Sequence, residues 1–130
     1  MSTAARKIEV SRRALWFGLF GGAVAWTAHL MFAYGVAEFG CVGRLGEHGS
    51  LGISMVAWLE VGLTVATTMA AAAATVVAYR SHRRLRSDEA ENAASAAERH
   101  IAWAGFLTSG TFTFIILFES IPILYYLHRC

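Results

Sequence analysis

Three long apolar stretches constrain the fold of this chain more than any other feature. They cover residues 14–39, 51–79 and 101–127. Each holds the ~20 apolar residues that a helix needs to cross a hydrocarbon core of about 30 Å. The chain is 56% hydrophobic with a mean hydropathy of +0.48, which is more apolar than the water-facing surface of a soluble domain allows. We therefore predict an all-α integral membrane protein, with one domain over residues 1–130 and three transmembrane helices.

Basic residues are distributed unevenly between the two sides that these spans create. Nine of the eleven Lys and Arg residues fall in the tail 1–13 and the connector 80–100, whereas only Arg44 and Arg129 lie elsewhere. Loops rich in Lys and Arg stay in the cytoplasm. We therefore expect a multi-pass membrane protein in an N-in, C-out topology, with the loop 40–50 outside, which in a bacterium is the periplasm.

The connector 80–100 begins basic and then turns acidic. Asp88 followed by Glu91 has the form of a helix N-cap box, and the residues after it are rich in alanine. We therefore predict that the third helix extends into the cytoplasm. The basic run Arg80–Arg86 adjoins a span and has no interleaved aromatic residues, so we interpret it as an anchor to anionic lipid headgroups and expect no nucleic-acid partner.

Small residues recur on one face of the first span. Gly18 and Gly22 are four residues apart, and Ala25 continues the same face. This spacing lets two helix backbones approach closely, so we expect Gly18, Gly22 and Ala25 to form a helix-packing face. The spacing leaves open whether the partner helix belongs to this chain or to another subunit.

One strongly polar residue stands out in each span: His29, Glu60 and Glu119. Counted at about 1.5 Å per residue from the expected outer ends, all three lie roughly 12–15 Å deep. Ionisable groups inside a bilayer tend to face protein rather than lipid, so we predict that the three form one intramembrane polar layer. The layer is interpreted either as a polar clasp that fixes helix packing, or as a proton relay or quinone-headgroup site.

Cys41 and Cys130 are the only cysteines of the chain. In the predicted topology both lie on the periplasmic side, because residues 128–130 follow the third span. Disulfides form and persist in that oxidising compartment, so we predict a Cys41–Cys130 bond. Two unpaired thiols, or a lipid attached to Cys41, are the alternatives.

Sequence motifs of catalysis do not occur in the chain. There is no CxxC, HExxH or Gly-rich phosphate loop, and no Ser, His and Asp that could plausibly meet. Haem ligation by His29 would need a second ligand at matching depth, and no other His lies in a span. We expect no metal site, no cofactor beyond a structural lipid or quinone, and no enzymatic activity of the chain on its own.

Two short segments carry a family resemblance: Gly21–Leu30, followed by Tyr34 and Cys41, and Ile121–Leu124, followed by Cys130. They resemble small membrane proteins encoded beside bacterial haem–copper cytochrome c oxidases. In those proteins a Gly-Pro-x-x-Trp-x-x-His-Leu motif opens the first helix, and here Ala23 occupies the proline position.

The resemblance implies an accessory or assembly subunit of a respiratory complex in the bacterial inner membrane, most readily a terminal cytochrome c oxidase. Its partners would be the larger membrane subunits of that oxidoreductase and the lipid bilayer. Two other functions stay open at this point. One is a quinone- or lipid-binding module that uses His29, Glu60 and Glu119, and the other is a small transporter or channel subunit.

Overall fold

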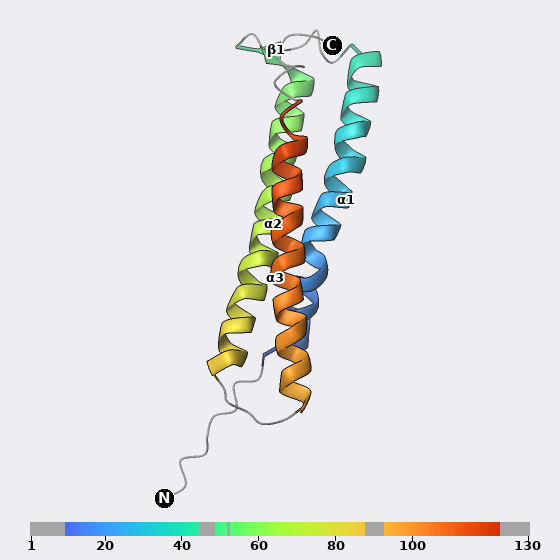
Figure 1. The fold of residues 1–130 in the computed structure, drawn as a ribbon. Coiled ribbons are helices and arrows are strands. Elements are labelled where there is room, and N and C mark those ends of the chain that lie inside the picture. Colours follow the sequence, from blue (N-terminus) through green and yellow to red (C-terminus); the bar gives the residue numbers. More distant parts are fainter. Residues whose placement is uncertain (1–9, 45–48, 52, 88–92, 123–130) are drawn as a thin grey trace, which may run out of the picture.

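The computed structural model describes residues 10–44, 49–51, 53–87 and 93–122. This part comprises the helices α1 (Arg12–Val42), α2 (Met55–Ser87) and α3 (Ala93–Glu119), with a short antiparallel hairpin of β1 (Gly49–Ser50) and β2 (Ile53–Ser54) before α2 (Figure 1). Each helix is long and apolar enough to cross a membrane. The predicted helical class is thus confirmed, as is the prediction of three helices long and apolar enough to cross a membrane.

Helix α2 begins and ends later than the predicted span 51–79. The hairpin occupies its expected first residues, where Leu51 has a left-handed φ of 59° that no helix contains. The Ser54 hydroxyl then accepts a hydrogen bond from the Ala57 N–H at 3.2 Å, as an N-cap residue does, and the helix continues to Ser87. Asp88 and Glu91, the predicted cap of the third helix, lie outside the described residues.

Helix α3 ends at Glu119, whereas the predicted third span runs to residue 127. Pro122 explains the end, because proline has no N–H to donate to the carbonyl of Phe118 and its ring clashes there. The Phe118 carbonyl instead accepts from the Ile121 N–H at 3.2 Å, which closes a tight final turn. Residues 123–130 lie outside the described part.

The contacts between α1 and α2 follow one constant register along the bundle. Helices α1 and α2 run antiparallel, so that Gly40 meets Val56 near one end, His29 meets Thr67 in the middle and Gly18 meets Ala78 near the other end. Helix α3 runs in the same direction as α1 and lies beside both other helices (Figure 1).

Small side chains fill the centre of the bundle. The alanines at its core expose at most 1% of their surface: Ala57, Ala71, Ala74, Ala78 and Ala102. Large apolar side chains such as Phe20, Met31 and Phe114 are exposed on the outside instead. This arrangement is typical of membrane bundles, where close van der Waals packing of small residues joins the helices and lipid solvates the large ones.

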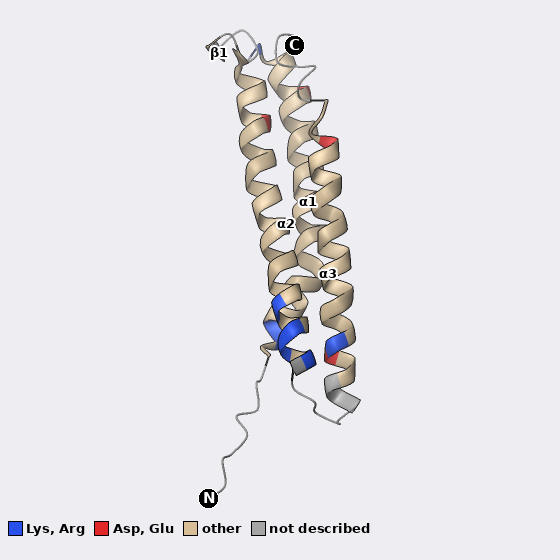
Figure 2. Ribbon diagram, turned by 60° about the vertical axis from the view of Figure 1, so that its left-hand side comes forward, with Lys and Arg blue, Asp and Glu red and all other residues tan. Residues whose placement is uncertain are grey.

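Arginine residues gather at one end of the bundle, which we call the basic end. It carries the described arginines of the start of α1, of the end of α2 and of the start of α3, and Figure 2 shows them gathered at the lower end of the bundle. These are Arg12, Arg13, Arg80, Arg83, Arg84, Arg86 and Arg99. We call the opposite end, with the hairpin and Arg44, the far end.

Candidate functional site

The predicted helix-packing face of α1 is covered by helices of the same chain. A Cβ atom on Gly22 would lie 2.5 Å from Cα of Ser109 on α3, and one on Gly105 would lie 3.0 Å from the backbone of Gly18. Gly105 and Ser109 therefore repeat the four-residue spacing of Gly18 and Gly22. This second pair was not predicted from the sequence, although the same spacing rule finds it.

The Ser109 hydroxyl links the two backbones at this crossing. It donates to the carbonyl oxygen of Gly18 at 2.6 Å and accepts from the N–H of Gly22 at 3.2 Å. Ala25, one turn further along, is buried with Ala71 of α2 and Ile116 of α3. The question left open by the sequence is thus answered: the partner of the small-residue face lies within this chain.

His29 is buried and bonds to α2. Its Nδ1 lies 3.1 Å from Oγ1 of Thr67, and that hydroxyl donates to the Leu63 carbonyl at 2.8 Å. Thr67 Oγ1 and His29 Nδ1 are thus within hydrogen-bond distance, and the tautomer of His29 decides which of the two atoms donates. His29 thus joins α1 to α2 and makes no hydrogen bond to a carboxylate of any described residue.

Glu119 bonds to α1 at the last residue of α3. Its Oε2 accepts a hydrogen bond from the indole Nε1 of Trp26 at 2.9 Å, and the Trp26 ring lies 5.2 Å from that of Phe112. The next residue, Ser120, donates to Oγ1 of Thr64 at 3.2 Å. The end of α3 is thus tied to both other helices, although Glu119 itself remains exposed in the isolated chain.

Glu60 is buried but has no hydrogen-bond partner among the residues that the structure describes. It lines a cavity of about 270 Å³ at the far end, together with Glu119 and Tyr34. Apolar and small residues make up the rest of the wall: Leu30, Ala33, Ala37, Cys41, Val56, Ala57 and Pro122. The structure therefore brings two of the three predicted polar residues to one cavity and places the third outside it.

The predicted single layer is staggered in the structure. In the antiparallel register of α1 and α2, Glu60 lies opposite Val36, which is about two turns, or ~10 Å, nearer the far end than His29. The depths differ from the expectation because they were counted from span ends at residues 39 and 51. Helix α1 ends at Val42 and helix α2 begins at Met55 instead.

Cys41 lines the far-end cavity, and no cysteine in the described ranges is free. Cys130 lies outside those ranges, so the Cys41–Cys130 disulfide stays a prediction. Over the described residues there is no group of three or more His, Cys, Asp or Glu side chains placed to hold a metal ion.

Comparison with known proteins assigns this chain to no family. Neither known protein families, nor curated proteins, nor solved structures give a match. Its function is therefore inferred from its own residues, from the resemblance of two short segments and from the geometry of the bundle.

Proposed function

We propose that this chain is a non-catalytic accessory subunit of a bacterial respiratory membrane complex, with a cytochrome c oxidase as the first candidate. A hollow of about 560 Å³ on the outward face of α1 carries the proposal. Small residues such as Ala23 and Ala28 line it, together with the large side chains of Met31 and Phe32, which are 72% and 64% exposed. Small residues beside large ones suit the side chains of a neighbouring transmembrane helix.

Two features of the bundle support this proposal. The glycine face of α1 is already used inside the chain, so the outward face is the side of α1 that is left for a partner. The residues that carry the family resemblance also join the helices, since Trp26 bonds to α3 and His29 to α2. Because this motif holds the three helices together, it stabilises a small unit that can be added to a larger complex.

The proposal includes the orientation N-in, C-out in the bacterial inner membrane. The clustering of arginines at the basic end supports it, because such residues favour the cytoplasmic side (Figure 2). In this orientation the first turns of α3, as far as Arg99, extend into the cytoplasm. The cavity with Glu60 and Glu119 then lies toward the periplasm.

We expect an affinity-tagged copy of the chain to co-purify with haem-bearing subunits, and Thr27→Trp to remove them. Thr27 lies in the α1 hollow, so an indole there would prevent a partner helix from approaching. The matched control is Val65→Trp, at an exposed position of α2 outside the hollow. The readout is the haem Soret absorbance per tagged chain, with an expected loss of roughly tenfold for Thr27→Trp and little change for the control.

Deleting the chain distinguishes an accessory role from a catalytic one. The yield of assembled complex should fall severalfold, while turnover per haem stays within about twofold of the wild-type value. A fully assembled complex with a large loss of turnover would contradict the accessory role and favour a part in proton or quinone chemistry.

The far-end cavity favours a second candidate function, the binding of a quinone headgroup or a structural lipid. Pockets for small molecules combine apolar walls with a few polar groups, and this cavity pairs apolar walls with Glu60, Glu119 and Tyr34. Its volume of about 270 Å³ fits a headgroup rather than a whole lipid. Glu60 has no hydrogen-bond partner among the described residues, so a ligand hydroxyl that donates to its carboxylate would satisfy it.

We expect Glu60→Leu to lower the amount of quinone or lipid retained per purified chain by roughly tenfold, because leucine removes the polar group from the cavity. Glu60→Gln keeps the shape and a hydrogen-bonding group and should retain most of the ligand. Glu38→Gln, at an exposed position of α1, is the control. Extraction followed by mass spectrometry measures the retained ligand, and equal retention by all three variants would exclude this candidate.

A further inference from the structure

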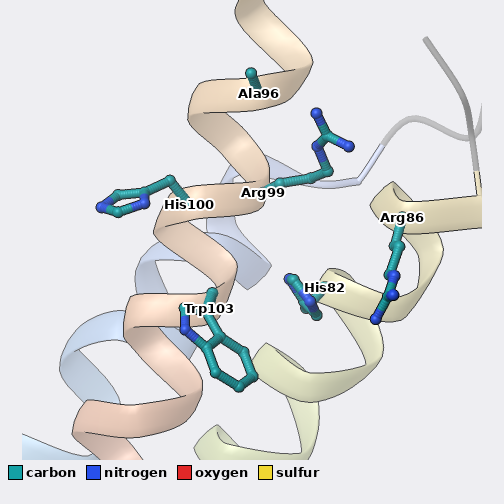
Figure 3. A pocket seen from close by; sticks show the side chains of 6 residues that line it. All are labelled: His82, Arg86, Ala96, Arg99, His100 and Trp103. Atoms are coloured by element: carbon teal, nitrogen blue, oxygen red, sulfur yellow. The ribbon is translucent and has the colours of Figure 1, made fainter.

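A second hollow lies at the basic end, between α2 and α3. It measures about 500 Å³ and is lined by His82 and Arg86 of α2 and by Ala96, Arg99, His100 and Trp103 of α3. Figure 3 shows Arg99 extending from α3 toward α2, with His82 and Arg86 on the facing helix. The lining thus combines two guanidinium groups from two helices with the imidazole of His82, whereas the His100 ring points away from α2 (Figure 3), and none of these residues is acidic.

His82 gives an independent indication of a ligand. Its Nδ1 atom is buried and has no hydrogen-bond partner among the residues described. A buried polar atom without a partner is unfavourable by about 1–3 kcal/mol, so it is normally satisfied by something bound nearby. The imidazole is held in place by the Trp103 ring, whose centroid lies 5.2 Å away.

Aromatic side chains continue from this hollow toward the middle of the bundle. The Trp103 ring lies 5.5 Å from that of Phe106, which lies 5.7 Å from the ring of Tyr79 on α2. Tryptophan and tyrosine favour the depth at which lipid headgroups meet the hydrocarbon core. The basic hollow is therefore placed where a charged headgroup lies, with an apolar wall beside it for acyl chains.

We propose that this hollow binds the phosphate group of an anionic phospholipid. Guanidinium groups clamp phosphate oxygens through charge-assisted hydrogen bonds, and basic pockets between transmembrane helices hold such headgroups. Soluble phosphates share this chemistry, but the aromatic wall next to the guanidiniums favours a lipid. Glu98 adjoins Arg99 in the sequence and does not line the hollow.

The test measures lipid binding to the full chain in detergent by native mass spectrometry. Cardiolipin and phosphatidylglycerol should bind at least about tenfold more tightly than zwitterionic phosphatidylcholine. Arg99→Gln and Arg86→Gln should each weaken anionic-lipid binding roughly tenfold, because each removes one charge-assisted contact. Arg83→Gln is the matched control, since it removes the same charge from an exposed position of the same helix outside the hollow, and it should weaken binding by about threefold or less.

Two results would overturn the proposal. If Arg83→Gln weakens binding as much as Arg86→Gln and Arg99→Gln, the attraction is a general effect of positive charge and the hollow is not a site. If inorganic phosphate displaces the lipid at an equal concentration of phosphate groups, the hollow is a site for soluble phosphates. The thermal midpoints of the variants should equal that of the wild type, which shows that each variant is folded when its lipid binding is measured.

Discussion

Replacing Gly22 by alanine is expected to lower the free energy of unfolding by roughly 2–4 kcal/mol. The added methyl group would lie 2.5 Å from Cα of Ser109, so α1 and α3 must move apart. That movement also weakens both hydrogen bonds of the Ser109 hydroxyl to the α1 backbone. Reversible unfolding in mixed micelles, followed by far-UV circular dichroism, measures the loss.

Gly35→Ala is the matched control for this substitution. Gly35 lies on the same helix, and nothing comes within 4 Å of the position that its Cβ would occupy. Alanine favours a helix over glycine by up to ~1 kcal/mol, so this variant should be unchanged or slightly more stable. Equal stability of the two variants would show that α1 and α3 do not cross at Gly22.

A further variant separates a clash with the backbone of Ser109 from a clash with its side chain. The atom nearest to the added methyl group is the Cα of Ser109, which every residue possesses. Ser109→Gly is therefore expected to leave the defect of Gly22→Ala unrepaired. Full recovery in the double variant would mean that only the serine side chain was in the way.

The second large effect is expected at the predicted disulfide. Non-reducing mass spectrometry of the purified chain should yield one peptide pair that joins Cys41 to Cys130. Cys41 and Pro122 line the same cavity at the far end, and eight residues lead from Pro122 to Cys130. At up to ~3.3 Å per extended residue, that length is sufficient for the C-terminus to reach Cys41.

Reduction of this bond should lower the thermal midpoint of the chain. Chain-entropy arguments give about 4–5 kcal/mol for so long a loop, and the measured effect should be smaller because membrane insertion already restricts the helices. Cys41→Ser and Cys130→Ser should show the same lowered midpoint and no further response to reductant. Alkylation of both thiols without prior reduction would exclude the bond.

The polar residues of the spans can be identified from the sequence, whereas their hydrogen-bond partners cannot. The pattern identifies His29, Glu60 and Glu119 as unusual, because each lies within an apolar run. Their partners cannot be read in the same way, since Thr67 and Trp26 are ordinary residues until the register of the helices places them opposite His29 and Glu119. A shift in register by one turn moves a partner by ~5 Å, which is more than a hydrogen bond spans.

The sequence by itself determined the class of this protein: three helices long and apolar enough to cross a membrane, with arginines gathered at one end of the bundle. The hydropathy of a segment and the distribution of charges are properties of the linear sequence, so the spans can be predicted without knowing the fold. Only the tertiary structure decided that Gly18 and Gly22 pack against Gly105 and Ser109 of the same chain. It also decided that Glu60 and Glu119 share a cavity without His29, because such contacts depend on helix ends and on interhelical register.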